Sequence, residues 1–165
     1  MSRYALGLDF GTNSCRALIV NLASGQEVAD DVYNYPTGEA GVVVDPADPN
    51  VARQHPQDYL DGTVAVVTRA LAKARDADRA FDPAHVIGIG VDTTGSTPIP
   101  VDRKGTPLAL LPEFRTDPNA MAWLWKDHTG HAEAARITAT AARMRPHYLA
   151  KCGGTYSSEW FWSKV

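Results

Sequence analysis

A short stretch near the N-terminus combines a carboxylate with small residues that could bind a phosphate. It reads Asp9-Phe-Gly-Thr-Asn-Ser-Cys-Arg16 and separates two apolar runs, Tyr4–Phe10 and Cys15–Val20, which predict two strands. A connection this short joins strands only as an antiparallel hairpin. Hydroxyl, amide and backbone N–H donors for an anion come from Thr12, Asn13 and Ser14.

Asp9 ends the first predicted strand, where a carboxylate is suited to hold Mg²⁺ directly or through water. Gly11 allows a tight turn, and Asn13 tolerates left-handed backbone dihedrals. The same residue types are also ordinary hairpin-turn chemistry. The motif alone therefore leaves two interpretations open, a phosphate loop and a plain turn.

The elements that follow must position this loop, and they predict an α/β fold. Residues 27–35 can return as a third strand after a turn at Ala23-Ser-Gly25. From Pro56, apolar residues recur at three- and four-residue spacing, which predicts a long helix. The next run, Val86–Val91, is apolar almost throughout and predicts a central strand covered on both faces. Residues 37–55, rich in Gly, Pro and Asp, predict an irregular surface insertion.

The order of these elements matches the first half of a ribonuclease H-like core. A helical crossover makes the strands that end at Asp9 and Asp92 parallel, so both carboxylates are expected at the same edge of the sheet. That geometry permits a metal–phosphate site. It also permits a two-metal nuclease, with Asp58 or Asp61 on the helix as a further ligand.

Composition narrows the class of protein. The 165 residues are 44% hydrophobic, which suits one domain with a sizeable core. Cys15 and Cys152 lie far apart in sequence and indicate reduced thiols. No signal-peptide h-region follows Met1 and no apolar run could span a bilayer, so we expect a cytoplasmic protein that does not bind membranes. The net charge of −3 and the lack of a basic cluster argue against a nucleic-acid partner.

The pattern Asp-x-Gly-Thr-x-Ser-x-Arg at a hairpin resembles the first phosphate loop of the sugar kinases related to actin. The resemblance continues through three later stretches, Val86–Asp102, Asn119–Thr129 and Gly153–Trp162. The resemblance therefore runs nearly end to end. Among these kinases, the chain most resembles the FGGY-type carbohydrate kinase family and its ribulokinase branch. It implies an incomplete ribonuclease H-like (actin-like ATPase) fold of the α/β class, with a mixed sheet flanked by helices.

The resemblance also implies an activity, the ATP-dependent phosphorylation of L-ribulose to L-ribulose 5-phosphate, with ATP and Mg²⁺ as cofactors and a small sugar as substrate. It assigns Asp9 to Mg²⁺. The residues expected around the phosphates are Thr12, Asn13, Ser14 and Arg16. Those expected near the sugar are Gly95, Ser96 and Asp127. Glycerol kinases carry an Arg-Glu pair where this chain carries Gly95-Ser96, and the smaller residues leave room for a ketopentose.

The family's catalytic Asp, its substrate Lys and its adenine-binding second domain have no match in this chain. The resemblance therefore implies that residues 1–165 are the N-terminal part of the first domain, are inactive alone and lack a catalytic base, which is expected downstream. A homo-oligomer stays open. An actin-like ATPase with a conformational output is a further alternative, because it shares the first loop, although it does not explain the later stretches.

Overall fold

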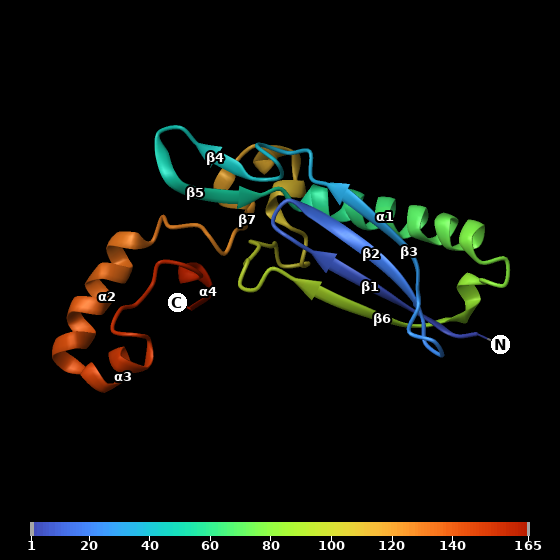
Figure 1. Ribbon diagram of the computed structural model, residues 1–165. Helices are drawn as coiled ribbons and strands as arrows, with labels where there is room; N and C mark the ends of the chain where they lie inside the picture. The colour runs from blue at the N-terminus through green and yellow to red at the C-terminus, as the bar shows by residue number, and fades with distance from the viewer. Residues whose placement is uncertain (1, 165) are drawn as a thin grey trace. The chain divides into compact units, whose positions relative to one another are not determined.

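The computed structural model describes residues 2–164, which form two compact units (Figure 1). Unit 1 contains residues 2–42 and 55–94, and unit 2 contains residues 43–54 and 95–164. Each unit has its own sheet.

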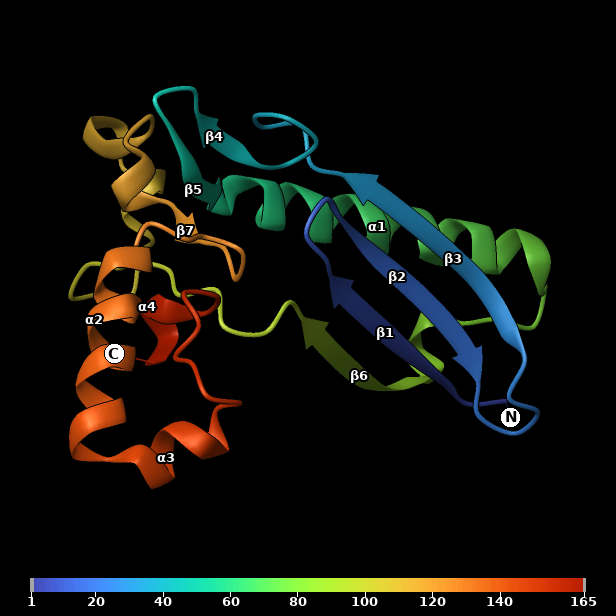
Figure 2. The ribbon, with the colours of Figure 1, turned by 60° about the vertical axis from the view of Figure 1, so that its left-hand side comes forward.

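Unit 1 is a four-stranded mixed sheet with one long helix. Its elements are β1 (Tyr4–Phe10), β2 (Ser14–Asn21), β3 (Glu27–Asn34), α1 (Pro56–Ala77), a short 3₁₀ helix (Pro83–His85) and β6 (Val86–Thr93). The strand order is β3-β2-β1-β6, as Figure 2 shows, with β1 antiparallel to β2 and parallel to β6. The sheet confirms the predicted hairpin, third strand and parallel crossover.

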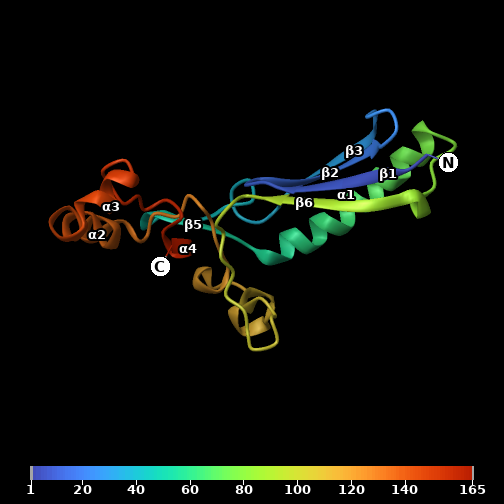
Figure 3. The same cartoon turned by 90° about the horizontal axis from the view of Figure 1, so that it is seen from below.

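Helix α1 covers one face of this sheet (Figure 3). It begins at Pro56, which needs no donor at the first helical position, and His55 Nδ1 caps it by accepting a hydrogen bond from Gln57 N at 3.1 Å. Helix and sheet share a buried core that includes Tyr4, Leu6, Cys15, Ala17, Ile19, Val66, Ala70 and Ala74. Because side chains alternate along a strand, Asp9 and Arg16 point to the opposite face.

A glycine in α1 sets how closely the helix approaches the sheet. A Cβ on Gly62 would lie 2.5 Å from Cys15 Sγ and 2.9 Å from Tyr33 Cδ1. Burial raises the pKa of the Cys15 thiol, which fits a packed cysteine better than a reactive one. The glycine is therefore a packing requirement of this helix–sheet contact.

We expect Gly62→Ala to destabilise the full-length protein by about 1–3 kcal/mol, because the added methyl overpacks the interface. Alanine favours a helix over glycine by about 1 kcal/mol, which is too little to offset contacts this short. Urea unfolding followed by circular dichroism measures the effect. Thr68→Ala, on the exposed side of α1, is the matched control and should cost nothing. A Gly62→Ala protein as stable as the wild type would contradict the packing argument.

Strand β6 is more exposed than its apolar sequence predicts. Within the described residues it is the last strand of its sheet, not a covered central one. Ile87, Ile89 and Val91 are 57%, 66% and 63% exposed. The apolar run identified the strand correctly, but it could not specify which part of a chain would cover it.

Unit 2 combines a three-stranded antiparallel sheet, in the order β4-β5-β7, with short helices. Its strands are β4 (Val43–Asp45), β5 (Asp48–Gln54) and β7 (Ala122–Trp123). Its 3₁₀ helices are Leu108–Leu110, Pro112–Phe114 and Pro118–Ala120, and its α-helices are α2 (His131–Met144), α3 (Pro146–Lys151) and α4 (Phe161–Lys164). Throughout residues 2–164, no helix is long and apolar enough to cross a membrane.

The segment 37–55 is more regular than its Gly, Pro and Asp content predicts. It contains β4 and β5, and β5 is stabilised by a strand from far along the chain, with Arg53 paired to Trp123 and Gln54 to Ala122. A local pattern could not anticipate that partner. That the segment is an insertion stays a prediction.

Candidate functional site

A row of charged side chains crosses the helix-free face of unit 1. Asp9 on β1 is in register with Arg16 on β2 and with Asp92 on β6. Arg16 Nη1 lies 3.6 Å from Asp9 Oδ2, and the two side chains are 62% and 48% exposed. A shallow hollow on the sheet includes all three residues in its lining. The predicted meeting of Asp9 and Asp92 at one edge is thus confirmed.

Two neighbouring carboxylates with solvent access are a donor set that suits Mg²⁺. This ion usually binds through one or two carboxylates, with water and substrate phosphates completing its shell. Asp92 Oδ1 also accepts a hydrogen bond from Thr93 N at 2.9 Å, which orients its side chain. Asp9 and Asp92 therefore fit the ion that the resemblance implies.

The loop between β1 and β2 is a tight turn closed by a hydrogen bond from Gly11 N to Ser14 O at 2.9 Å. Neither Gly11 nor Asn13 has a positive φ, although the sequence suggested a left-handed residue here. The space at Gly11 is tight instead, since a Cβ on it would lie 3.3 Å from Ser14 O.

The predicted phosphate ligands of this loop differ in accessibility. Thr12 is partly buried at the tip of the turn, whereas Ser14 is only 7% exposed at the start of β2. The Asn13 side chain is exposed, but its amide donates to Ala40 O at 2.6 Å. Arg16 is exposed on the face that carries Asp9. The loop therefore presents Thr12 and Arg16 more openly than Ser14.

The acidic residues of α1 do not complete a nuclease site. Asp58 is 4% exposed, and Thr37 donates to both of its carboxylate oxygens. Asp61 is exposed and accepts from Gln57 Nε2 at 2.8 Å. Because α1 packs on the face of the sheet opposite Asp9, this arrangement disfavours the two-metal hypothesis.

Gly95 and Ser96 lie in unit 2, in an exposed connection that follows β6. A Cβ on Gly95 would meet no atom within 4 Å, and its φ is not positive, so the backbone does not require glycine there. Ser96 has a φ of 59°, a left-handed conformation that is uncommon for a residue other than glycine. Such strained residues gather at functional sites, which makes this segment a candidate on structural grounds as well.

Asp127, which the resemblance assigns to the sugar, lies at the centre of a buried polar network in unit 2. Its Oδ2 accepts from Ala52 N at 2.8 Å and pairs with the guanidinium of Arg53. Its Oδ1 accepts from Thr129 N at 3.2 Å and from Trp162 Nε1 at 3.1 Å. With its side chain fully buried and both oxygens occupied, Asp127 presents no acceptor to a sugar in this structure.

Arg53 is the functional candidate that the sequence did not reveal. Its guanidinium lies 3.7 Å from the centre of the Trp123 ring, and the Trp123 and Trp162 rings meet edge to face at 4.7 Å. Burial lowers the pKa of Arg53 to about 10, so it remains charged at neutral pH. No local pattern links Arg53 with Asp127, 74 residues later.

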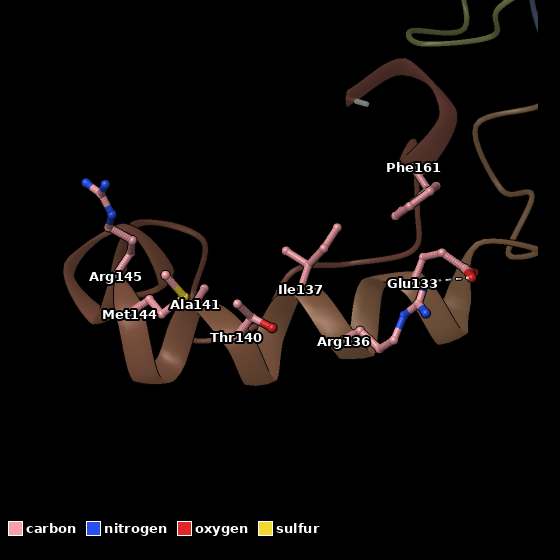
Figure 4. A pocket seen from close by; sticks show the side chains of 8 residues that line it. All are labelled: Glu133, Arg136, Ile137, Thr140, Ala141, Met144, Arg145 and Phe161. Carbon is pink, nitrogen blue, oxygen red and sulfur yellow. Dashed lines mark hydrogen bonds and ion pairs between the residues drawn. The ribbon is translucent and has the colours of Figure 1, made fainter.

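Unit 2 also has a hollow, which lies along α2 (Figure 4). Its apolar lining includes Ile137, Met144 and Phe161. Glu133 forms an ion pair with Arg136 at 3.3 Å in the same lining. Phe161 packs so closely that a Cβ on Gly130 would lie 2.4 Å from its ring. None of the predicted site residues lines this hollow.

The chain is similar in sequence and in fold to known sugar kinases. It is 50% identical to a ribulokinase of Vibrio parahaemolyticus and 39% identical to one of Geobacillus thermodenitrificans, in both cases over 99% of its own length. It spans only 28% of the length of each relative. A solved glycerol kinase of Plasmodium falciparum with ADP matches 96% of this chain and 27% of its own, with a TM-score of 0.65 at 14% identity.

This structural likeness confirms the predicted ribonuclease H-like fold. Residues 4–150 match the N-terminal domain of the FGGY family of carbohydrate kinases. That match covers most of the sequence, and the chain thus belongs to the FGGY family of carbohydrate kinases.

Proposed function

We propose that this chain is part of an ATP-dependent L-ribulokinase, which transfers the γ-phosphoryl group of ATP to a terminal hydroxyl of L-ribulose and releases ADP and L-ribulose 5-phosphate. The observation that carries the proposal is the similarity to ribulokinases along the whole chain. The row of Asp9, Arg16 and Asp92 supports it, because phosphoryl transfer depends mainly on positioning and on neutralising charge.

In this proposal the helix-free face of unit 1 binds the phosphates. Asp9 and Asp92 would hold Mg²⁺, which neutralises charge on the transferred group. Thr12 and Arg16 would contact the phosphates. The buried Ser14 would stabilise the loop without contacting them. The general base that takes the hydroxyl proton would come from a later part of a longer protein. We accordingly expect residues 1–165 to be inactive alone, and the enzyme to act in the cytoplasm.

The sugar side of the proposal rests on unit 2. Gly95 and Ser96 would contact the ketopentose directly. Asp127 would act through the indoles of Trp123 and Trp162, because it holds Arg53 beneath one ring and bonds to the other. This indirect role replaces the direct sugar contact expected from the sequence.

A coupled assay of ADP release by the full-length protein tests the proposal. With MgATP, turnover should depend on L-ribulose and be far weaker with glycerol. ADP release that is equally fast without any sugar would favour an actin-like ATPase, and no turnover with any sugar would refute the kinase assignment.

Enlarging Gly95 should damage sugar binding selectively. In the full-length enzyme, we expect Gly95→Arg to raise the KM for L-ribulose by about tenfold or more, because a long side chain would occupy the space left for the substrate. The KM for ATP should change little. Gly95→Ala is the matched control and should be well tolerated, since its Cβ would meet no atom. Equal losses for both substrates would contradict the assignment of Gly95 to the sugar.

A further inference from the structure

We propose that Asn13 acts by holding the phosphate loop in place, and that Thr37 and Asp58 are positioning residues that fix it from α1. The phosphate loop is residues 11–14, and the brace consists of Asp58, Thr37, Ala40 and Asn13. The inference rests on the proposed function, in which this loop binds the phosphates. It deepens that function by assigning a role to residues that need not touch a ligand.

The brace is anchored in the first turn of α1. Asp58 is 4% exposed, and its two oxygens accept from Thr37 N at 3.1 Å and from Thr37 Oγ1 at 2.8 Å. Hydrogen bonds to a carboxylate are stronger than neutral ones. Since α1 is packed on the sheet, Thr37 is fixed to a rigid element.

A tight turn carries this constraint from Thr37 toward the loop. Glu39 and Val42 exchange backbone hydrogen bonds at 2.8 and 3.0 Å. Between them Ala40 and Gly41 both have positive φ, at 49° and 87°, as a type I′ turn requires. A Cβ on Gly41 would lie 2.7 Å from Tyr35 Cβ, so the turn is also packed against the chain that enters it. The direction of the Ala40 carbonyl is therefore set.

Two hydrogen bonds, one from the side chain and one to the backbone, hold Asn13 in place. Its side-chain amide donates to Ala40 O at 2.6 Å, and its backbone carbonyl accepts from Tyr35 N at 2.9 Å. These contacts lock the centre of a loop whose ends are closed by the bond from Gly11 N to Ser14 O. A preorganised loop binds an anion without first having to be ordered. The brace accordingly accounts for an asparagine whose side chain points to protein rather than to a ligand.

The test compares variants of the full-length protein that weaken the brace at Thr37, outside the phosphate loop itself. Thr37→Val removes the hydroxyl donor but keeps the shape, and should raise the KM for MgATP about tenfold, as expected for a lost bond to a charged group. The KM for L-ribulose should not change. Thr37→Ser keeps the hydroxyl donor, and its KM for MgATP should equal that of the wild type. Thr63→Val removes a hydroxyl that donates to Tyr59 O within α1, and should have no effect.

Coupling between the two ends of the brace provides the decisive comparison. Asn13→Ala and Thr37→Val should each raise the KM for MgATP, and the double variant should be no worse than Asn13→Ala alone, because Asn13→Ala already removes the side-chain bond that joins the loop to the brace. Additive losses, or a loss with Asn13→Ala but none with Thr37→Val, would overturn the brace and make Asn13 a direct ligand.

Hydrogen exchange without ligands separates this inference from the proposed function. Thr37→Val should speed exchange at the amides of residues 11–14 and 39–42, with no change in the middle of β1. Unchanged exchange in the loop would refute the brace even if the enzyme is a ribulokinase. Faster exchange in a protein that phosphorylates no sugar would uphold the brace and refute only the proposed function.

Discussion

Asp9→Ala in the full-length protein is expected to lower kcat by about 10²–10³-fold, the size of effect seen when one charge-stabilising group of an active site is removed. Asp9 is half-exposed on the helix-free face, and its ion pair with Arg16 is also exposed, so its loss should cost little stability. An interaction made chiefly in the transition state should appear in kcat more than in KM. Steady-state kinetics, combined with unfolding curves, measure both effects.

Two further variants sharpen this test. Asp9→Asn keeps the shape but removes the charge, and should lose nearly as much activity as Asp9→Ala. Asp30→Ala, which removes an exposed carboxylate from β3 of the same sheet, should leave kcat unchanged. Near-normal kcat in Asp9→Ala, or an equal loss in Asp30→Ala, would refute a direct role for Asp9.

The parts of the fold that the sequence predicts well are those with short-range causes. The hairpin follows from a turn too short for any other connection, and α1 follows from Pro56 and an apolar repeat with helical spacing. The parallel pairing of β1 with β6 follows from the crossover helix, and it brings Asp9 next to Asp92. Local pattern and chain topology were therefore enough to predict that Asp9 and Asp92 meet in unit 1, whereas the place of Arg16 beside Asp9 follows from the observed register.

What the sequence could not predict depends on partners far along the chain. The pairing of β5 with β7 and the contact of Arg53 with Asp127 each join segments about 70 residues apart, and neither leaves a local signal. Asn13 was assigned to phosphate because its residue type suits an anion, but its geometry depends on a turn at Ala40. For β6, the apolar run shows that the strand favours burial, yet not what would cover it.

The buried pair of unit 2 leads to the largest expected effect on stability. Asp127→Ala should destabilise the full-length protein by about 3–5 kcal/mol, because it leaves the Arg53 guanidinium buried without its carboxylate. Trp162 Nε1 and Ala52 N would lose an acceptor at the same time. Urea unfolding should show the loss of stability. The near-ultraviolet circular dichroism signal of the tryptophans should also weaken, because the edge-to-face contact of Trp123 with Trp162 would be disturbed.

A double replacement distinguishes an unpaired charge from a general defect of packing. Arg53→Met together with Asp127→Ala removes both charges, and should be more stable than Asp127→Ala alone, since replacing both members of a buried pair is far less harmful than removing one. Glu133→Ala breaks the exposed pair with Arg136 and should cost less than about 1 kcal/mol, which makes it the matched control for losing a carboxylate in unit 2. If Asp127→Ala were as mild as Glu133→Ala, or if the second change added to the damage, the buried charge of Arg53 would not be the cause.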